Sequence, residues 1–119
     1  MSTIVAQRCL VLRTKPIPLN QKFFISRGRN ILSKKYRETK EALALETKSQ
    51  WKGAPLKAKL TVNIVLYFGD KRHRDIDAYL KILLDSMEGI VYEDDEQIVE
   101  LHVFKEYSKA DPRTEVGIL

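Results

Sequence analysis

Apolar and polar residues alternate most regularly between residues 57 and 68. One face of this segment carries only apolar side chains, namely Leu60, Val62, Ile64, Leu66 and Phe68. The opposite face includes Thr61, Asn63 and Tyr67. A period of two is typical of a β-strand with one buried side. The pattern therefore predicts a strand over 57–68 that lies against the core.

Two other segments have a helical period. Apolar residues recur every three or four positions at Ile76, Leu80, Leu83, Leu84 and Met87. This stripe predicts a helix over 76–88, which Gly89 ends as a C-terminal cap. Ser33 is an N-cap for a second helix that reaches about residue 49, with Tyr36 and Leu43 on its apolar face.

The remaining elements are predicted from strand-forming residues and turn signals. Residues 3–13 indicate a strand, and the prolines at 16 and 18 indicate an extended loop after it. Residues 21–32 are interpreted as a basic loop with a short strand at 23–26. Residues 97–107 and a last strand at 113–119 are predicted to form a hairpin. The order β-α-β-α-β-β predicts an α+β fold, a single two-layer domain over 1–119 with both helices on one face of a mixed sheet.

Length and composition narrow the class of protein. A chain of 119 residues is long enough for one domain with a small core. It contains no apolar run of about 18 residues, so we expect no membrane span, and residues 1–15 do not have the pattern of a secretory signal. The single cysteine, Cys9, has apolar neighbours and is predicted to be a buried thiol in a protein of the reducing cytoplasm.

The net charge of +5 conceals an uneven distribution. Residues 1–69 carry 14 Lys and Arg against 3 Asp and Glu, whereas residues 70–119 carry 7 against 13. The basic half indicates a polyanionic partner, with nucleic acid as the first candidate. The acidic half lies among periodic apolar segments, so it is part of the fold and indicates a bound cation.

The acidic residues of interest are Asp75, Asp77, Asp94 and Asp95. Residues two apart on a helix do not face the same way. The carboxylates of Asp75 and Asp77 can therefore contact the same position only if Asp75 is the N-cap of the helix and Asp77 lies in its first turn. A helix over 75–88 rises about 21 Å, and the seven residues from Gly89 to Asp95 span at most about 25 Å. If the chain returns antiparallel to the helix, residues 89–95 are therefore just long enough to bring Asp95 back to Asp75 and Asp77. Alternatively, a partner subunit completes the site.

Three converging carboxylates suit Mg²⁺ or Mn²⁺, which prefer oxygen ligands. Lys81, four residues after Asp77, is then placed to contact a phosphate, or it forms an exposed salt bridge with Asp77. Helix capping and solvated loop charge explain the same residues without a metal. The residues alone leave both interpretations open.

The segments RDIDAYLK and GIVYEDDEQI resemble the RusA family of Holliday-junction resolvases. The family pattern is an arginine, then D-x-D-N-x-x-K, a helix and D-D-x-Q-[IV] entering a strand. Upstream, PIPLNQKFF and SRGRNILSKKYR are similar to the proline-asparagine loop, basic segment and first helix of the family. The resemblance covers most of the chain. It implies a homodimeric Mg²⁺-dependent endonuclease, of bacterial or phage origin, that resolves four-way junctions by paired symmetric nicks.

Carried over to matching positions, the resemblance implies metal-binding catalytic carboxylates at Asp75, Asp77 and Asp95. It also implies a catalytic lysine at Lys81 and a DNA contact at Arg74. One departure is Ala78, where the family usually has asparagine. This departure motivates an alternative, a catalytically weak or silent protein that binds branched DNA, although the three aspartates and the lysine of the motif are all present.

Phosphate contacts are predicted in the basic half and beside the acidic motif. These residues are Lys22, Arg27, Arg29, Lys34, Lys35, Arg37, Lys71, Arg72 and Arg74. Phe23 and Phe24 are interpreted as core residues, with stacking or wedging at the DNA crossover as the alternative. A two-fold symmetric junction calls for a C₂ homodimer, because one chain offers a single acidic site.

Overall fold

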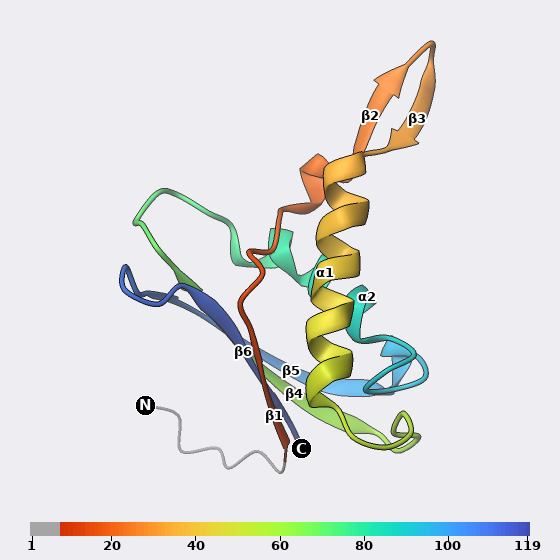
Figure 1. Cartoon of the computed structure of the whole chain (residues 1–119), viewed down its shortest axis with the longest axis vertical. Helices are drawn as coiled ribbons and strands as arrows, with labels where there is room; N and C mark the ends of the chain where they lie inside the picture. Colours follow the sequence, from red (N-terminus) through yellow and green to blue (C-terminus); the bar gives the residue numbers. More distant parts are fainter. Residues whose placement is uncertain (1–7) are drawn as a thin grey trace.

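A computed structural model describes residues 8–119, and its main element is a four-stranded mixed sheet (Figure 1). The strands are β1 (Arg8–Leu12), β4 (Leu60–Phe68), β5 (Ile98–Tyr107) and β6 (Arg113–Ile118). Their order in the sheet is β1-β6-β4-β5, with β5 parallel to β4 and the other two pairings antiparallel. The predicted α+β class and mixed sheet are confirmed; residues 3–7 of the predicted first strand lie outside the described residues.

Strand β4 confirms the alternation in the sequence. Its residues are buried and partly buried in strict alternation, with Leu60, Val62, Ile64, Leu66 and Phe68 on the buried side. Because β4 is paired on both edges, it forms the centre of the sheet. This arrangement contradicts the predicted hairpin of the last two strands, since β4 lies between β5 and β6. The reason is the helical crossover from β4, which returns the chain as a parallel neighbour of β4 itself.

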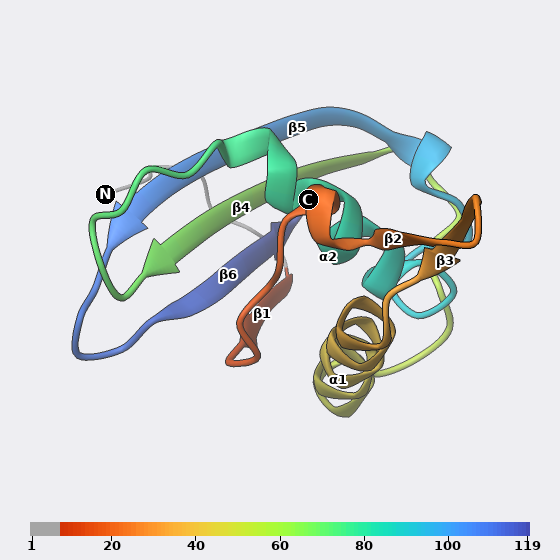
Figure 2. The same cartoon turned by 90° about the horizontal axis from the view of Figure 1, so that it is seen from above.

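Both helices lie on one side of the sheet, as predicted (Figure 2). Helix α1 (Lys34–Gln50) begins at Ser33, whose hydroxyl accepts a hydrogen bond from the Tyr36 N–H at 3.0 Å. The second helical segment starts as a 3-10 turn, η2 (Ile76–Tyr79), and continues as α2 (Leu80–Met87). The apolar stripe of α2 packs into the core, with Leu83 and Met87 fully buried.

A two-stranded hairpin, β2 (Phe23–Ser26) and β3 (Arg29–Leu32), projects away from the sheet and helices (Figure 1). Arg27 and Gly28 form its turn with φ of 52° and 75°, which matches the two left-handed residues of a type I′ turn. The short strand predicted at 23–26 is therefore confirmed, and the basic loop after it contains a second strand. The interpretation of Phe23 and Phe24 as core residues is wrong, because both are about half exposed on this projecting hairpin.

Cys9 is exposed, so its predicted burial is wrong. Successive side chains of a strand point to opposite faces. In β1 the buried residues are Leu10 and Leu12, so Cys9 faces away from the core. Apolar neighbours in the sequence therefore did not indicate the side on which the thiol lies.

Two 3-10 turns complete the chain, η1 (Leu19–Gln21) before the hairpin and η3 (Asp95–Gln97) before β5. Within residues 8–119, no helix has the length and apolar character needed to cross a bilayer.

Candidate metal and nucleic-acid site

Three acidic residues and one lysine lie along one side of the η2–α2 segment. Asp77, Lys81, Asp85 and Glu88 are spaced by four, four and three residues, so they fall on one helical face. Lys81 Nζ lies 3.2 Å from Asp85 Oδ1. The ion pair considered from the sequence, Asp77 with Lys81, is replaced by this pairing one turn further along the helix.

The Asp94–Asp95 loop is held by a network centred on Gln97. The side chain of Asp94 accepts a hydrogen bond from the Glu96 N–H at 2.9 Å, as in a capping box. Gln97 Oε1 accepts hydrogen bonds from the N–H groups of Glu93 and Asp94, both at 3.0 Å. The Asp94 side chain therefore stabilises the turn, whereas the Asp95 carboxylate lies close to α2.

Gln97 also ties this loop to the body of the domain. Its Nε2 donates hydrogen bonds to the carbonyls of Leu56 at 2.8 Å and Ala58 at 2.9 Å. These carbonyls belong to the segment before β4. One side chain thus links the Asp94–Asp95 loop to the start of the central strand.

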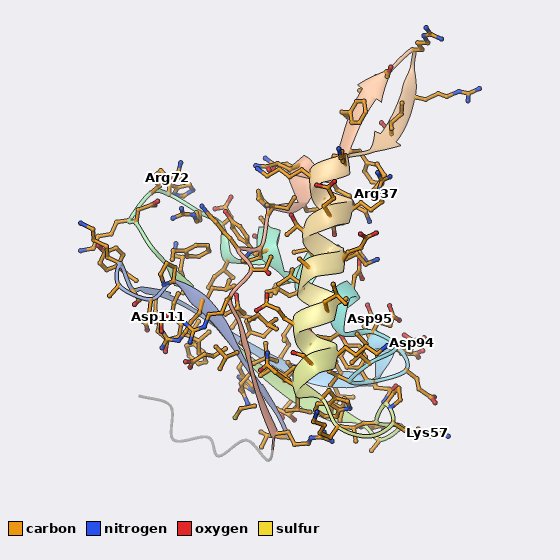
Figure 3. The ribbon with its side chains drawn as sticks, viewed as in Figure 1. Arg37, Lys57, Arg72, Asp94, Asp95 and Asp111 are labelled. Carbon is orange, nitrogen blue, oxygen red and sulfur yellow. The ribbon has the colours of Figure 1, made fainter. Side chains whose placement is uncertain are left out.

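Asp95 meets the carboxyl-terminal half of α2 (Figure 3). One carboxylate oxygen each from Asp85, Glu88 and Asp95 lie within 4.8 Å of one another. A set of carboxylate oxygens without sulfur or imidazole suits Mg²⁺ or Mn²⁺. Asp85 and Glu88 were not among the predicted site residues, although their spacing from Lys81 is a helical repeat in the sequence.

Asp75 and Asp77 lie at the other end of the same helical segment. Asp75 is the N-cap of η2, as predicted, but its carboxylate makes no capping hydrogen bond and lies 3.2 Å from His73 Nε2. Asp77 occupies the first turn and is exposed. Among residues 8–119, neither belongs to the close group around Asp95. The joint metal-binding role of Asp75, Asp77 and Asp95 therefore stays a prediction.

The acid-rich surface changes the ionisation of two neighbours. A hydrogen bond to Asp85 raises the pKa of Lys81, so its ammonium stays protonated at neutral pH. Burial raises the pKa of Tyr92, and the charges of Asp95 and Glu88 add to this effect. The hydroxyl of Tyr92 therefore stays protonated at neutral pH, and it donates a hydrogen bond to the Leu84 carbonyl at 2.6 Å. Lys81 is thus a fixed positive charge beside the carboxylates.

Arg74 is buried, whereas a residue that contacts phosphate is expected to be exposed. Its side chain is buried over the Phe68 ring at 4.4 Å, and its Nη1 lies 2.8 Å from Asp70 Oδ1. The hydrogen bond from Arg74 holds the pKa of Asp70 well below its usual range. The observed contacts of Arg74 are internal to the 70–74 loop, so its contact with DNA stays a prediction.

A hollow of about 490 Å³ lies between the proline loop, the start of α1 and residues 72–74, which directly precede Asp75 in the chain. Its basic lining includes the predicted contacts Lys35, Arg72 and Arg74. Lys15 also lines it and was missed, because nothing in the local sequence distinguishes it from other surface lysines. Phosphate groups are the natural ligands of such a surface.

The other predicted DNA contacts are distributed over the same end of the molecule. Arg27 and Arg29 lie at the turn of the projecting hairpin. Arg37 is exposed on α1 near the hairpin (Figure 3), and Lys34 pairs with Glu38 at 3.7 Å. Lys71 lies over the Tyr107 ring at 5.1 Å. Only part of the predicted set therefore gathers around the hollow, and the rest extends along the hairpin and α1.

Comparison with known proteins covers nearly the whole described chain. The sequence model of the family described as endodeoxyribonuclease RusA matches residues 14–119. The crossover junction endodeoxyribonuclease RusA of Aquifex aeolicus (strain VF5) is 32% identical over 102 residues, which are 84% of this chain and 81% of that protein. The uncharacterized protein YqaN of Bacillus subtilis (strain 168) is 46% identical over 44 residues, 37% of this chain and 30% of that protein. The chain belongs to the RusA family of endodeoxyribonucleases.

Proposed function

We propose that this protein is a Mg²⁺-dependent endodeoxyribonuclease that resolves Holliday junctions by paired symmetric nicks, in DNA recombination and repair. The family and the name of the Aquifex relative support the substrate and the reaction. The observation that carries the proposal is the basic hollow, whose lining includes His73, and His73 Nε2 lies 3.2 Å from the carboxylate of Asp75 at the start of the acidic helical segment. We further propose that it acts in the cytoplasm of a bacterial or phage-infected cell.

The basic surface positions the DNA backbone. Lys35 on α1 and Arg72 on the 70–74 loop approach the hollow from two sides, and Lys15 comes from the proline loop. Phosphate contacts of this kind fix the register of the DNA without reading its bases. A backbone held in the hollow contacts His73, which pairs with Asp75, so it lies near this proposed metal ligand.

The carboxylates are the proposed ligands of the divalent ion, with Mn²⁺ as a possible substitute for Mg²⁺. Asp75, Asp77 and Asp95 are the proposed set, and Asp85 and Glu88 add negative charge around Asp95. Their donor atoms are all carboxylate oxygens, which fits the chemistry of these ions. When bound, such an ion activates water and neutralises charge on the phosphate.

Lys81 is proposed as the protein's own source of positive charge at the reacting phosphate. Asp85 raises its pKa, so it does not act as a proton-abstracting base at neutral pH. Its ammonium instead stabilises negative charge that develops during cleavage. The ion pair with Asp85 fixes its direction in the absence of DNA.

A homodimer supplies the second site that paired nicks require. A junction with two-fold symmetry matches a C₂ dimer, in which each protomer cuts one of two equivalent strands.

Cleavage of labelled DNA tests the function directly. Purified protein with Mg²⁺ is expected to cut a four-way junction at two symmetric positions and to leave linear and flapped DNA intact. Asp75→Asn is expected to abolish cutting while junction binding stays equal or tightens, because negative charge near phosphate is removed. Glu41→Gln, an exposed carboxylate change on α1, is the matched control and should cut normally. Cutting by Asp75→Asn at the wild-type rate would exclude Asp75 as a ligand.

A second candidate function rests on Ala78, which replaces the asparagine that the family pattern has. A catalytically weak or silent protein that binds branched DNA would bind the junction without cutting it, even with Mn²⁺. Ala78 packs partly against the core at the end of η2, next to Asp77 in the sequence. If Ala78→Asn gains cleavage that the wild type lacks, this second function is the correct one for the natural chain.

A further inference from the structure

The outer edge of β5 has no partner in the part of the chain that the structure describes. β5 is ten residues long, and its one neighbour in the sheet is β4. From the outer side, no hydrogen bond reaches its backbone within residues 8–119. A long exposed edge presents a row of unpaired N–H and C=O groups, which natural proteins usually shorten, cover or interrupt.

The opposite edge of the sheet, formed by β1, is covered by side chains of α1. β1 has only five residues. Gln50 of α1 accepts a hydrogen bond from the Val11 N–H and donates one to the Val11 carbonyl, both at 2.8 Å. Glu46 accepts from the N–H groups of Arg13 and Thr14 at 2.7 Å. One edge is therefore capped by side chains, whereas the longer one is left open.

The side chains of β5 are also unusually apolar for exposed positions. Val99 is 58% exposed, Phe104 and Tyr107 are each 45% exposed, and Leu101 is 36% exposed. The strand contains no proline or glycine that would interrupt pairing. A strand with free backbone groups and exposed large apolar side chains is suited to join another strand.

We propose that β5 pairs antiparallel with β5 of a second copy of this chain, so that one sheet runs continuously through a homodimer. The charges of the strand support a second copy over DNA. Glu100 and Glu106 outnumber Lys105, whereas a DNA-binding surface is basic. The basic hollow is lined by other elements and stays open in this arrangement.

The register follows from symmetry and charge. A two-fold axis through an antiparallel strand pair places one residue opposite its own copy, and residues at equal distances on either side face each other. Centring on Phe104 stacks two phenyl rings and places His102 opposite Glu106. It also places Leu101 opposite Tyr107, so no like charges face each other.

Neighbouring registers are less favourable. A centre at residue 103 sets Glu100 against Glu106, and a centre at residue 105 sets Lys105 against its own copy. Like charges directly opposite on a sheet destabilise the pairing. A centre at residue 102 places Glu106 opposite the apolar Ile98. The Phe104-centred register is therefore the proposed one.

This interface supplies the dimer that the proposed function requires, and to that extent it rests on that function. The pairing itself does not depend on cleavage, so the two ideas fail separately. A dimer joined through β5 that never cuts junctions would refute the nuclease proposal alone. Symmetric cutting by a dimer joined elsewhere would refute the interface alone.

Cysteine cross-linking tests the register. Residues directly opposite on antiparallel strands have Cβ atoms about 4.5–5.5 Å apart, close to the range that a disulfide bridges. Cys9 is exposed, so the test uses a Cys9→Ser background. Phe104→Cys is expected to give about tenfold more disulfide-linked dimer on mild oxidation than Leu45→Cys, a control at an exposed apolar position of α1.

Sedimentation measures the strength of the interface. The wild-type chain is expected to sediment as a dimer, and Phe104→Lys should raise the dimer dissociation constant by about 100-fold, because like charges replace an apolar pair. Leu45→Lys should leave this constant unchanged. Circular dichroism shows whether each variant is folded, and if Phe104→Lys is not, the cross-link decides. A monomeric wild type, or equal cross-linking by the two cysteine variants, overturns the proposal.

Discussion

Replacing Gln97 with alanine removes the side chain that holds the Asp94–Asp95 loop. Gln97 makes four hydrogen bonds, two accepted from the N–H groups of Glu93 and Asp94 and two donated to the carbonyls of Leu56 and Ala58. All four lie between 2.8 and 3.0 Å. The substitution therefore cuts the connection between the loop and the segment before β4.

The expected loss follows from the number of bonds. Each hydrogen bond contributes about 0.5–1.5 kcal/mol net to stability, and water reaches this partly exposed site and replaces some of them. We expect Gln97→Ala to lower the free energy of unfolding by about 2–4 kcal/mol. Asp95 is two residues away and loses its fixed position, so junction cleavage and Mn²⁺ affinity should fall about 10–100-fold.

Gln50→Ala is the matched control, because it removes a similar network far from the acidic residues. Gln50 makes two hydrogen bonds to Val11 at 2.8 Å and one to the Glu46 carbonyl at 3.2 Å. Urea unfolding should show a comparable loss of stability, about 1.5–3 kcal/mol, with cleavage by the folded protein unchanged. If Gln97→Ala keeps wild-type stability and cleavage, the network does not position Asp95. Equal loss of cleavage in both variants would mean that general destabilisation is the cause.

Three further predictions address charge. Lys81→Ala should slow single-turnover cleavage more than it weakens junction binding if, as proposed, the ammonium beside Asp85 acts on developing charge; a loss confined to binding would reassign it to DNA contact. Arg72→Ala and Lys35→Ala should each weaken junction binding and reduce the salt dependence of the binding constant by about one ion, and an unchanged salt slope would remove them from the interface. Hydrogen bonding from Arg74 lowers the pKa of Asp70 in the folded protein below its ordinary 3.8, so this carboxylate stabilises the fold above that pH and the contribution is lost as pH falls below it. Urea titrations should show Asp70→Asn less stable than wild type at pH 7, with the gap closing below pH 3.8, and a constant gap would contradict the ion pair.

Local patterns in the sequence determined the elements. The alternation over residues 57–68 specified β4 and its buried face, because side chains of a strand point alternately to two sides. Ser33 specified the start of α1, since its hydroxyl accepts from a helix N–H that has no partner within the helix. The motif residues around Asp75 and Asp95 were enough to indicate the family. Each of these signals is contained in a short segment of the chain.

Tertiary structure alone decided which distant segments meet. The sequence did not show that β4 separates β5 from β6, because the order of strands depends on how the crossover returns to the sheet. It did not show that Asp95 meets Asp85 and Glu88, since that contact depends on the packing of α2 and on the turn held by Gln97. Periodicity reports the immediate neighbours of a residue, whereas convergence depends on long-range packing that no short segment encodes.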